Sequence, residues 1–259
     1  MQVVLDILSQ SAIDQNATLL LICILLLIPV LPFLRRKVKL GKGPVLRPIS
    51  GYTALQNVVS QSVETGYPVH VSVGVRGIGQ QSIAQTLAGL GVLEHLAQQT
   101  AEYDAAPLVS VADGTALAAA QDVLRRASAR RGQAKKLDPY QVRMIAPEPT
   151  AYASGVMGLL SRERLWANVM NGVFGDEYLL MGETAARKEI QQVAGSGNPQ
   201  SLPFMMVSAD HTLIGEEMFA AGAYLSGLAY HIASLVLQDW MRTIIILIIL
   251  VGVVLSTVL

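Results

Sequence analysis

Two long, uncharged apolar runs near its ends constrain this 259-residue chain more than any other feature. Residues 17–34 read ATLLLICILLLIPVLPFL, and residues 243–259 read TIIILIILVGVVLSTVL. A stretch of about 17 to 25 predominantly apolar residues is long enough to cross the hydrocarbon core of a bilayer as a helix. The sequence therefore predicts two transmembrane helices, and the lipid bilayer is the first partner that we expect.

The charges beside the first run predict an orientation. Five basic residues follow it closely (Arg35, Arg36, Lys37, Lys39 and Lys42), whereas only acidic charges, Asp6 and Asp14, precede it. Basic flanks favour the cytoplasmic side of a membrane. A cleaved signal peptide is the alternative, but it would place basic residues before the apolar run. We therefore expect a chain with both termini outside the cytoplasmic membrane and a cytoplasmic middle.

These features divide the chain into six predicted segments. They are an extracytoplasmic N-terminal segment (1–16), a transmembrane helix (17–34), a basic juxtamembrane linker (35–50), a cytoplasmic α/β domain (51–212), packing helices rich in small residues (213–242) and a transmembrane helix (243–259). The uncharged segment Phe219–Leu237 could be a third span. Its many Gly, Ala and Ser residues instead favour a helix packed closely against protein, with a second copy of the chain as partner in a homo-oligomer.

Between the apolar runs, short apolar stretches alternate with longer helical patterns. The stretches 68–74, 107–113, 140–147, 177–183 and 202–210 are typical of buried strands. The segments 53–64, 80–103, 115–130, 150–165 and 184–195 are typical of helices. Strict alternation predicts an α/β fold with a mostly parallel, Rossmann-like open sheet and helices on both faces.

A glycine-rich stretch, GVRGIG, follows the first predicted strand and precedes a predicted helix. In a dinucleotide site, Gly74, Gly77 and Gly79 would let the backbone approach a phosphate, and Arg76 would supply a cation. Asp113, after the second strand, would bind the ribose. However, the spacing is GxxGxG rather than GxGxxG, and a short glycine loop is common at a sharp turn. We favour the turn and keep a nucleotide cofactor as the alternative.

The densest group of potentially catalytic side chains is Asp210, His211, Glu216 and Glu217. Their spacing does not match a zinc-binding helix, and acidic residues are favourable in a first helical turn. The single cysteine, Cys23, lies within the first apolar run, and His70 is expected in the core or at the surface. We therefore predict no metal site and no catalytic residues.

A run of cations closes the helical pattern at 115–130: Arg125, Arg126, Arg130, Arg131, Lys135 and Lys136. Positive charge there stabilises a helix C-terminus, and contact with anionic lipid headgroups is the functional alternative. The formal net charge is zero, so the composition does not indicate a nucleic-acid partner.

Several strings together resemble an uncharacterised family of bacterial membrane proteins, known as a domain of unknown function between terminal apolar segments. They include GYTALQNVVSQSVETGYPVHVSVG, QTLAGLGVLEHLA, YASGVMGLL, GDEYLLMGE and SADHTLIGEEMFAAGAYL. The resemblance implies a bacterial, membrane-bound protein and assigns no activity, cofactor or residue role.

Two functional hypotheses remain. In the first, the cytoplasmic domain forms a homo-oligomeric scaffold or ligand-sensing assembly without catalysis, which fits the anchoring and the scarcity of catalytic groups. In the second, a membrane-tethered nucleotide-binding protein or enzyme uses the loop from Gly74 to Gly79. An open polar pocket at the strand ends would favour ligand binding over a pure scaffold.

Overall fold

A computed structural model describes residue 25 and residues 28–41, 43–79, 82–101, 103, 105–130 and 138–258 of the chain. The chain divides into two compact units. The first, named here the α/β domain, is Leu46–Ser226, and it extends beyond the predicted 51–212 at both ends. The second, named the terminal unit, combines Met1–Val45 with Gly227–Leu259.

The α/β domain is built on one six-stranded sheet in which every pairing is parallel. Its strands are β1 (Val69–Gly74), β2 (Leu108–Val111), β3 (Val142–Met144), β4 (Ala167–Val173), β5 (Gln191–Ser196) and β6 (His211–Ile214). Their order across the sheet is β3-β2-β1-β4-β5-β6. This is the order of doubly wound nucleotide-binding folds, and it reverses between β1 and β4. The predicted α/β class with an open parallel sheet is confirmed.

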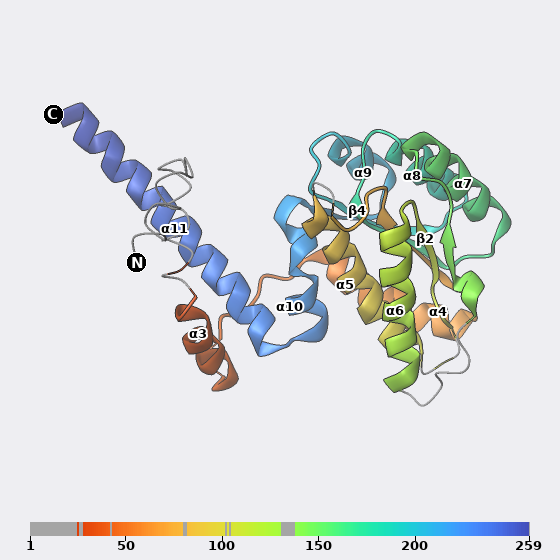
Figure 1. The fold of residues 1–259 in the computed structure, drawn as a ribbon, viewed down its shortest axis with the longest axis horizontal. Coiled ribbons are helices and arrows are strands. Elements are labelled where there is room, and N and C mark those ends of the chain that lie inside the picture. Colours follow the sequence, from red (N-terminus) through yellow and green to blue (C-terminus); the bar gives the residue numbers. More distant parts are fainter. Residues whose placement is uncertain are drawn as a thin grey trace, which may run out of the picture. The chain divides into compact units, whose positions relative to one another are not determined.

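Helices cover both faces of the sheet. One group consists of α4 (Ser50–Thr65), α5 (Ile83–Thr100) and α6 (Gly114–Arg130), and the other of α7 (Pro149–Arg162), α8 (Tyr178–Arg187) and α9 (Leu202–Ser208). Neighbours within each group contact one another, and Figure 1 shows the groups on opposite sides of the sheet. Short 3-10 helices at Pro139–Gln141 and Gly215–Ala220 and helix α10 (Ala221–Ser226) complete the domain.

Large buried side chains fill the space between the sheet and helices α7, α8 and α9. Tyr152, Phe174, Tyr178, Met181 and Met205 are each fully buried in this cluster. Burial of such side chains contributes on the order of 1.5–3 kcal/mol each relative to exposure. This layer of buried side chains therefore stabilises the sheet and fixes the positions of the strand ends.

Two of the predicted strands are wrong. The stretch 177–183 lies in α8 and the stretch 202–210 lies largely in α9. In α8 the buried residues Tyr178, Met181, Gly182 and Ala185 follow one another at helical spacing, so one face of a helix is buried rather than a whole strand. Because the stretch 177–183 is largely apolar, the helical spacing of its buried residues was not apparent from the sequence.

Strands β4 and β5 occupy places that the sequence patterns did not assign to strands. Strand β4 reads ANVMNGV and carries two buried asparagines, which are depleted in strands. Strand β5 reads QQVAGS, and all of it except Ser196 falls within the segment 184–195, which was predicted to be helical. Helix α8 instead ends at Arg187, and the chain turns at Glu189, whose φ is 56°.

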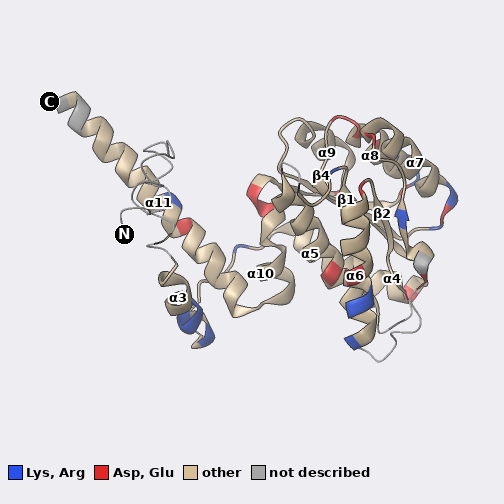
Figure 2. Ribbon diagram, in the orientation of Figure 1, with Lys and Arg blue, Asp and Glu red and all other residues tan. Residues whose placement is uncertain are grey.

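Among the described residues, the terminal unit contains two helices in contact, α3 (Val30–Lys39) and α11 (Ala229–Val258). Within α11, residues Ala229–Val254 are long and apolar enough to cross a membrane, and none of that window is buried. At about 1.5 Å per residue, such a helix exceeds the thickness of a bilayer core. The first predicted span, 17–34, lies mostly outside the described residues. Basic residues gather at the end of α3, where the linker was predicted (Figure 2).

The small-residue segment Phe219–Leu237 is not one helix. Its first part forms α10, which packs against α4 and α5 of the same domain and buries Ala221 and Ala223. Gly227, with a φ of 62°, ends this part, and α11 then runs without a break through the boundary predicted at Thr243. The small residues of α10 thus have partners within their own chain.

Candidate functional site

The glycine-rich loop after β1 turns sharply because two of its glycines adopt conformations that other residues avoid. Gly74 has a φ of 98° and Gly79 a φ of 97°. A Cβ atom on Gly74 would lie 2.4 Å from the backbone nitrogen of Val173, on the neighbouring strand β4. Glycine is therefore required at position 74 by the backbone alone. This agrees with the interpretation of the loop as a structural turn, but it does not exclude a ligand.

The same loop is tethered to the start of α6. The Thr115 hydroxyl oxygen accepts a hydrogen bond from the Ile78 backbone nitrogen at 2.8 Å, and its proton goes to the Asp113 carboxylate. Asp113 also accepts from the Thr115 backbone nitrogen at 2.8 Å. These bonds, the Thr115 hydroxyl first, lower the pKa of Asp113. A Cβ atom on Gly77 would lie 2.0 Å from this carboxylate, so a larger residue there would displace the Asp113 side chain.

An open hollow of about 550 Å³, named here the carboxyl-edge hollow, lies beyond the carboxyl ends of the strands. It is lined by residues of the loop after β1, the start of α5 and the ends of β4 and β5: Arg76, Ser82, Gln85, Val173, Gly197, Asn198 and Pro199. Strand order reverses between β1 and β4, so the hollow occupies the place where open α/β sheets bind ligands.

Hydrogen bonds between side chains and backbone groups hold the walls of the carboxyl-edge hollow. Gln85 on α5 accepts a hydrogen bond from the Gly197 backbone nitrogen at 2.9 Å, and Asn198 donates to the Phe174 carbonyl oxygen at 2.8 Å. The hollow is therefore formed by groups that are already fixed relative to one another. A preformed site of this kind loses little conformational entropy when a ligand binds.

The electrostatics of the hollow favour an anion. Arg76 is exposed and, among the residues that the structure describes, it takes part in no ion pair. Helix α5 is 18 residues long, its first turn contains no acidic residue, and its start at Ser82 has no side-chain cap within the described ranges. A helix N-terminus carries a partial positive charge and unsatisfied N–H groups.

The structure thus separates the predicted nucleotide-site residues. Arg76 lines the hollow, whereas Asp113 and Gly77 contact each other on the β2 side of the loop. The prediction missed Gln85 and the segment Gly197–Pro199. The cluster GSGNP at 195–199 is a strong turn signal, but it could not be placed at a strand end while β5 was assigned to a helix.

A second group of polar side chains, named here the buried polar row, crosses the amino-terminal half of the sheet. It contains Ser72, His70, Ser110, Asn168 and Gln192 from four strands, together with Tyr152 from α7, and each is fully or almost fully buried. The His70 ring bonds Asn168 Oδ1 at 2.7 Å and Ser110 Oγ at 2.8 Å. The Tyr152 hydroxyl bonds the Ser72 and Ser110 hydroxyls at 2.6 Å each.

The row continues to β5 and defines the protonation of His70. Gln192 donates to the Gly182 and Ser208 carbonyl oxygens at 3.0 and 2.8 Å. Because an amide oxygen only accepts, the proton of neutral His70 lies on Nδ1 and Nε2 accepts from Ser110. Burial, the dominant effect, lowers the pKa of His70 to about 4. The row therefore stabilises the sheet, and His70 lies in the core.

The four residues grouped as Asp210, His211, Glu216 and Glu217 do not converge. Asp210 accepts a hydrogen bond from the Gln192 backbone nitrogen at 2.7 Å, and Glu217 forms an ion pair with Arg47 at 2.5 Å. No group of three or more His, Cys, Asp or Glu side chains that could hold a metal ion occurs in the described part of the chain.

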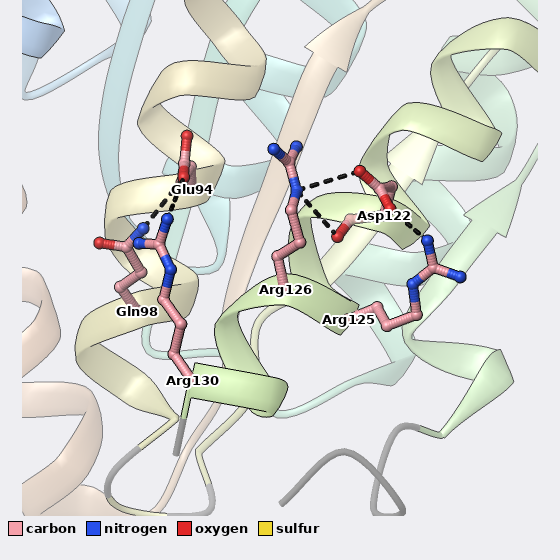
Figure 3. Close-up of polar contacts among 6 residues, drawn as sticks. All are labelled: Glu94, Gln98, Asp122, Arg125, Arg126 and Arg130. Atoms are coloured by element: carbon pink, nitrogen blue, oxygen red, sulfur yellow. Dashed lines mark hydrogen bonds and ion pairs between the residues drawn. The ribbon is translucent and has the colours of Figure 1, made fainter. Parts of the chain in front are cut away.

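The described cations of α6 are paired with carboxylates of α6 and α5 (Figure 3). Asp122 binds both Arg125 and Arg126, the latter at 3.0 Å, and Arg130 lies 3.9 Å from Glu94 on α5. Exposed pairs of this kind contribute about 0–1 kcal/mol each. Arg131, Lys135 and Lys136 lie outside the described residues, so lipid contact by this run stays a prediction.

Comparison with known families gives one match, to a family described only as "Domain of unknown function (DUF6754)", over residues 9–259. No curated protein and no solved structure matches the chain. Because the match covers nearly the whole sequence, the chain belongs to this uncharacterised family.

Proposed function

We propose that this member of an uncharacterised family is a membrane-anchored ligand sensor, whose α/β domain binds a small phosphate-bearing molecule in the carboxyl-edge hollow. The observation that carries the proposal is the coincidence of three features. The hollow lies where the strand order reverses, and it is lined by Arg76 and bordered by the start of α5. Within the described part of the chain, Arg76 has no ion-pair partner and the start of α5 has no side-chain cap. All three favour a bound phosphate.

The same geometry restricts how the ligand lies. In dinucleotide-binding folds, an acid after the second strand binds the ribose hydroxyls. Here Asp113 is bonded to Thr115, and the loop at Gly77 packs directly on its carboxylate. The ligand therefore extends over β4 and β5 towards Asn198, which is the opposite direction from the ribose of a dinucleotide.

We assign no reaction to the hollow. Its described lining contains an arginine, a serine and two amide side chains, but no His, Cys, Asp, Glu or Lys. General acid–base and nucleophilic catalysis need such groups within hydrogen-bond reach of the substrate. Binding without turnover is typical of a sensor, and this is the ligand-sensing form of the first hypothesis above.

The proposed membrane anchoring goes beyond the single apolar helix that the structure describes. The helix is long and apolar enough for one span. A second span at 17–34, a cytoplasmic α/β domain and termini on the outer side are parts of the proposal that rest on sequence patterns. A bacterial origin is a further part, and it rests only on the family resemblance. Assembly into a homo-oligomeric scaffold also remains a prediction, and its support is reduced because α10 packs on its own domain.

Native mass spectrometry of the detergent-extracted full chain tests the proposal. We expect a nucleotide-sized adduct on each copy of the wild type, and its loss in Arg76→Gln, because the variant removes the cation but no packing contact. Arg126→Gln is the matched control, since it removes an exposed arginine that is paired to Asp122. A large oligomer without an adduct, or equal adducts in both variants, would contradict ligand binding at the hollow.

A further inference from the structure

A second hollow, named here the amino-edge hollow, lies at the opposite edge of the sheet. It forms where α7 and α8 both end and where the chain enters β4 and β5, and its volume is about 460 Å³. The polar part of its wall consists of Tyr67, Ser161, Arg162, Glu163, Arg164 and Lys188. These residues come from three separate segments of the chain.

The charge of the amino-edge hollow is strongly positive. Arg162, Arg164 and Lys188 form no ion pair with any other residue that the structure describes. Glu163 is the one carboxylate among its lining residues, and the Arg143 guanidinium already binds it at 2.9 Å. Three cations therefore surround a concavity whose own acid is neutralised from outside.

Helix ends account for only part of this charge. Arg162 lies in the last turn of α7, and Lys188 directly follows α8. Each helix C-terminus carries roughly half a negative charge, so the two ends together offset about one of the three cations. Arg164 belongs to neither helix, and its charge has no such structural role.

We propose that the amino-edge hollow binds a small polyanion through phosphate groups. Two guanidinium groups offer paired N–H donors that match phosphate oxygens, and the Lys188 ammonium adds a compact charge. The Tyr67 and Ser161 hydroxyls provide neutral donors in the same wall. The volume fits a molecule of metabolite size. The phosphate belongs either to the headgroup of an anionic lipid or to a soluble diphosphate. This site is independent of the carboxyl-edge hollow.

Acetylation of the Lys188 amine, followed residue by residue with mass spectrometry, reports on this site directly. The full chain is labelled in detergent with and without pyrophosphate, and after reconstitution into vesicles of phosphatidylcholine alone or mixed in equal parts with phosphatidylglycerol. Protection of Lys188 by pyrophosphate supports a soluble ligand, and protection only in phosphatidylglycerol vesicles supports a lipid headgroup. Equal labelling in all four conditions would overturn the proposal.

Two variants separate a binding site from a merely shielded lysine. We expect Arg162→Gln and Arg164→Gln each to weaken the protection of Lys188 by about tenfold in ligand concentration, the usual effect of losing one charge-assisted hydrogen bond. Arg125→Gln, an exposed cation paired within α6, should leave the protection unchanged. Protection that survives in both hollow variants would show that no anion is bound by these arginines.

Discussion

Polar side chains at the two ends of the parallel sheet differ in hydrogen bonding and exposure. In its amino-terminal half, His70, Asn168 and Gln192 are buried side by side and bond to one another or to nearby carbonyl oxygens. Towards the carboxyl end of β4, Asn171 is equally buried, but neither atom of its amide has a hydrogen-bond partner among the described residues. Beyond the strand ends, Arg76 is exposed beside an open hollow. The residues of the buried polar row are thus hydrogen-bonded within the fold, whereas the Asn171 amide has no described partner and Arg76 is exposed to a ligand.

Replacing each buried asparagine of β4 by leucine provides the largest test of this comparison. Asn168→Leu should lower the free energy of unfolding by about 3 kcal/mol, because it leaves the His70 Nδ1 proton buried without an acceptor. Asn171→Leu should change it by less than about 1 kcal/mol, since no hydrogen bond to a described residue is lost. Urea unfolding of the full chain in detergent measures both. Equal losses would mean that the two ends do not differ.

Between about pH 7 and pH 5, acidification should act on the amino-terminal half through His70. The folded pKa of His70 is about 4, while an unfolded histidine titrates near 6.5, so the unfolded chain binds the extra proton between these values. Stability from this group is complete above the unfolded pKa and falls as the pH drops, by about 2 kcal/mol between roughly pH 7 and pH 5. The measurement is the difference in that slope between wild type and His70→Gln. Identical slopes would contradict a buried neutral imidazole.

At the carboxyl end, the tether between the loop and α6 predicts a smaller effect. Thr115→Val keeps the shape of the side chain but removes the acceptor for the Ile78 backbone nitrogen and a donor to Asp113. We expect a loss of about 1 kcal/mol in the free energy of unfolding, because the site is exposed and water replaces the lost bonds. The pKa of Asp113 should rise in the variant, as measured by NMR titration. A loss as large as that of Asn168→Leu would place the tether within the structural core.

How much of this could be read from the sequence differs along the chain. Strands β1, β2 and β3 were predicted because Val, Ile and Leu dominate them and glycine or proline bounds them. Strands β4 and β5 were not, because their buried amides find partners only elsewhere in the fold: Asn168 bonds His70 on β1, and Gln192 bonds carbonyl oxygens of α8 and α9. A single strand gives no sign of a partner that lies on another strand.

The residues of the candidate site also differ in how far the sequence could predict them. Arg76 and the glycines were found from local spacing alone, since a loop between a strand and a helix is a local feature. The hydrogen bond from Gly197 to Gln85 joins residues that are far apart in sequence, and it depends on β5 lying next to β4. The carboxyl-edge hollow could therefore not be predicted from local sequence patterns once β5 had been assigned to a helix.

The buried polar row also has a consequence for how the family can diverge. A change at His70 removes one hydrogen-bond partner from both Asn168 and Ser110, so we expect a lone substitution there to be destabilising. We therefore expect relatives either to keep all residues of the buried polar row or to replace them together by apolar residues. Relatives that have lost this histidine should have lost its two neighbours as well.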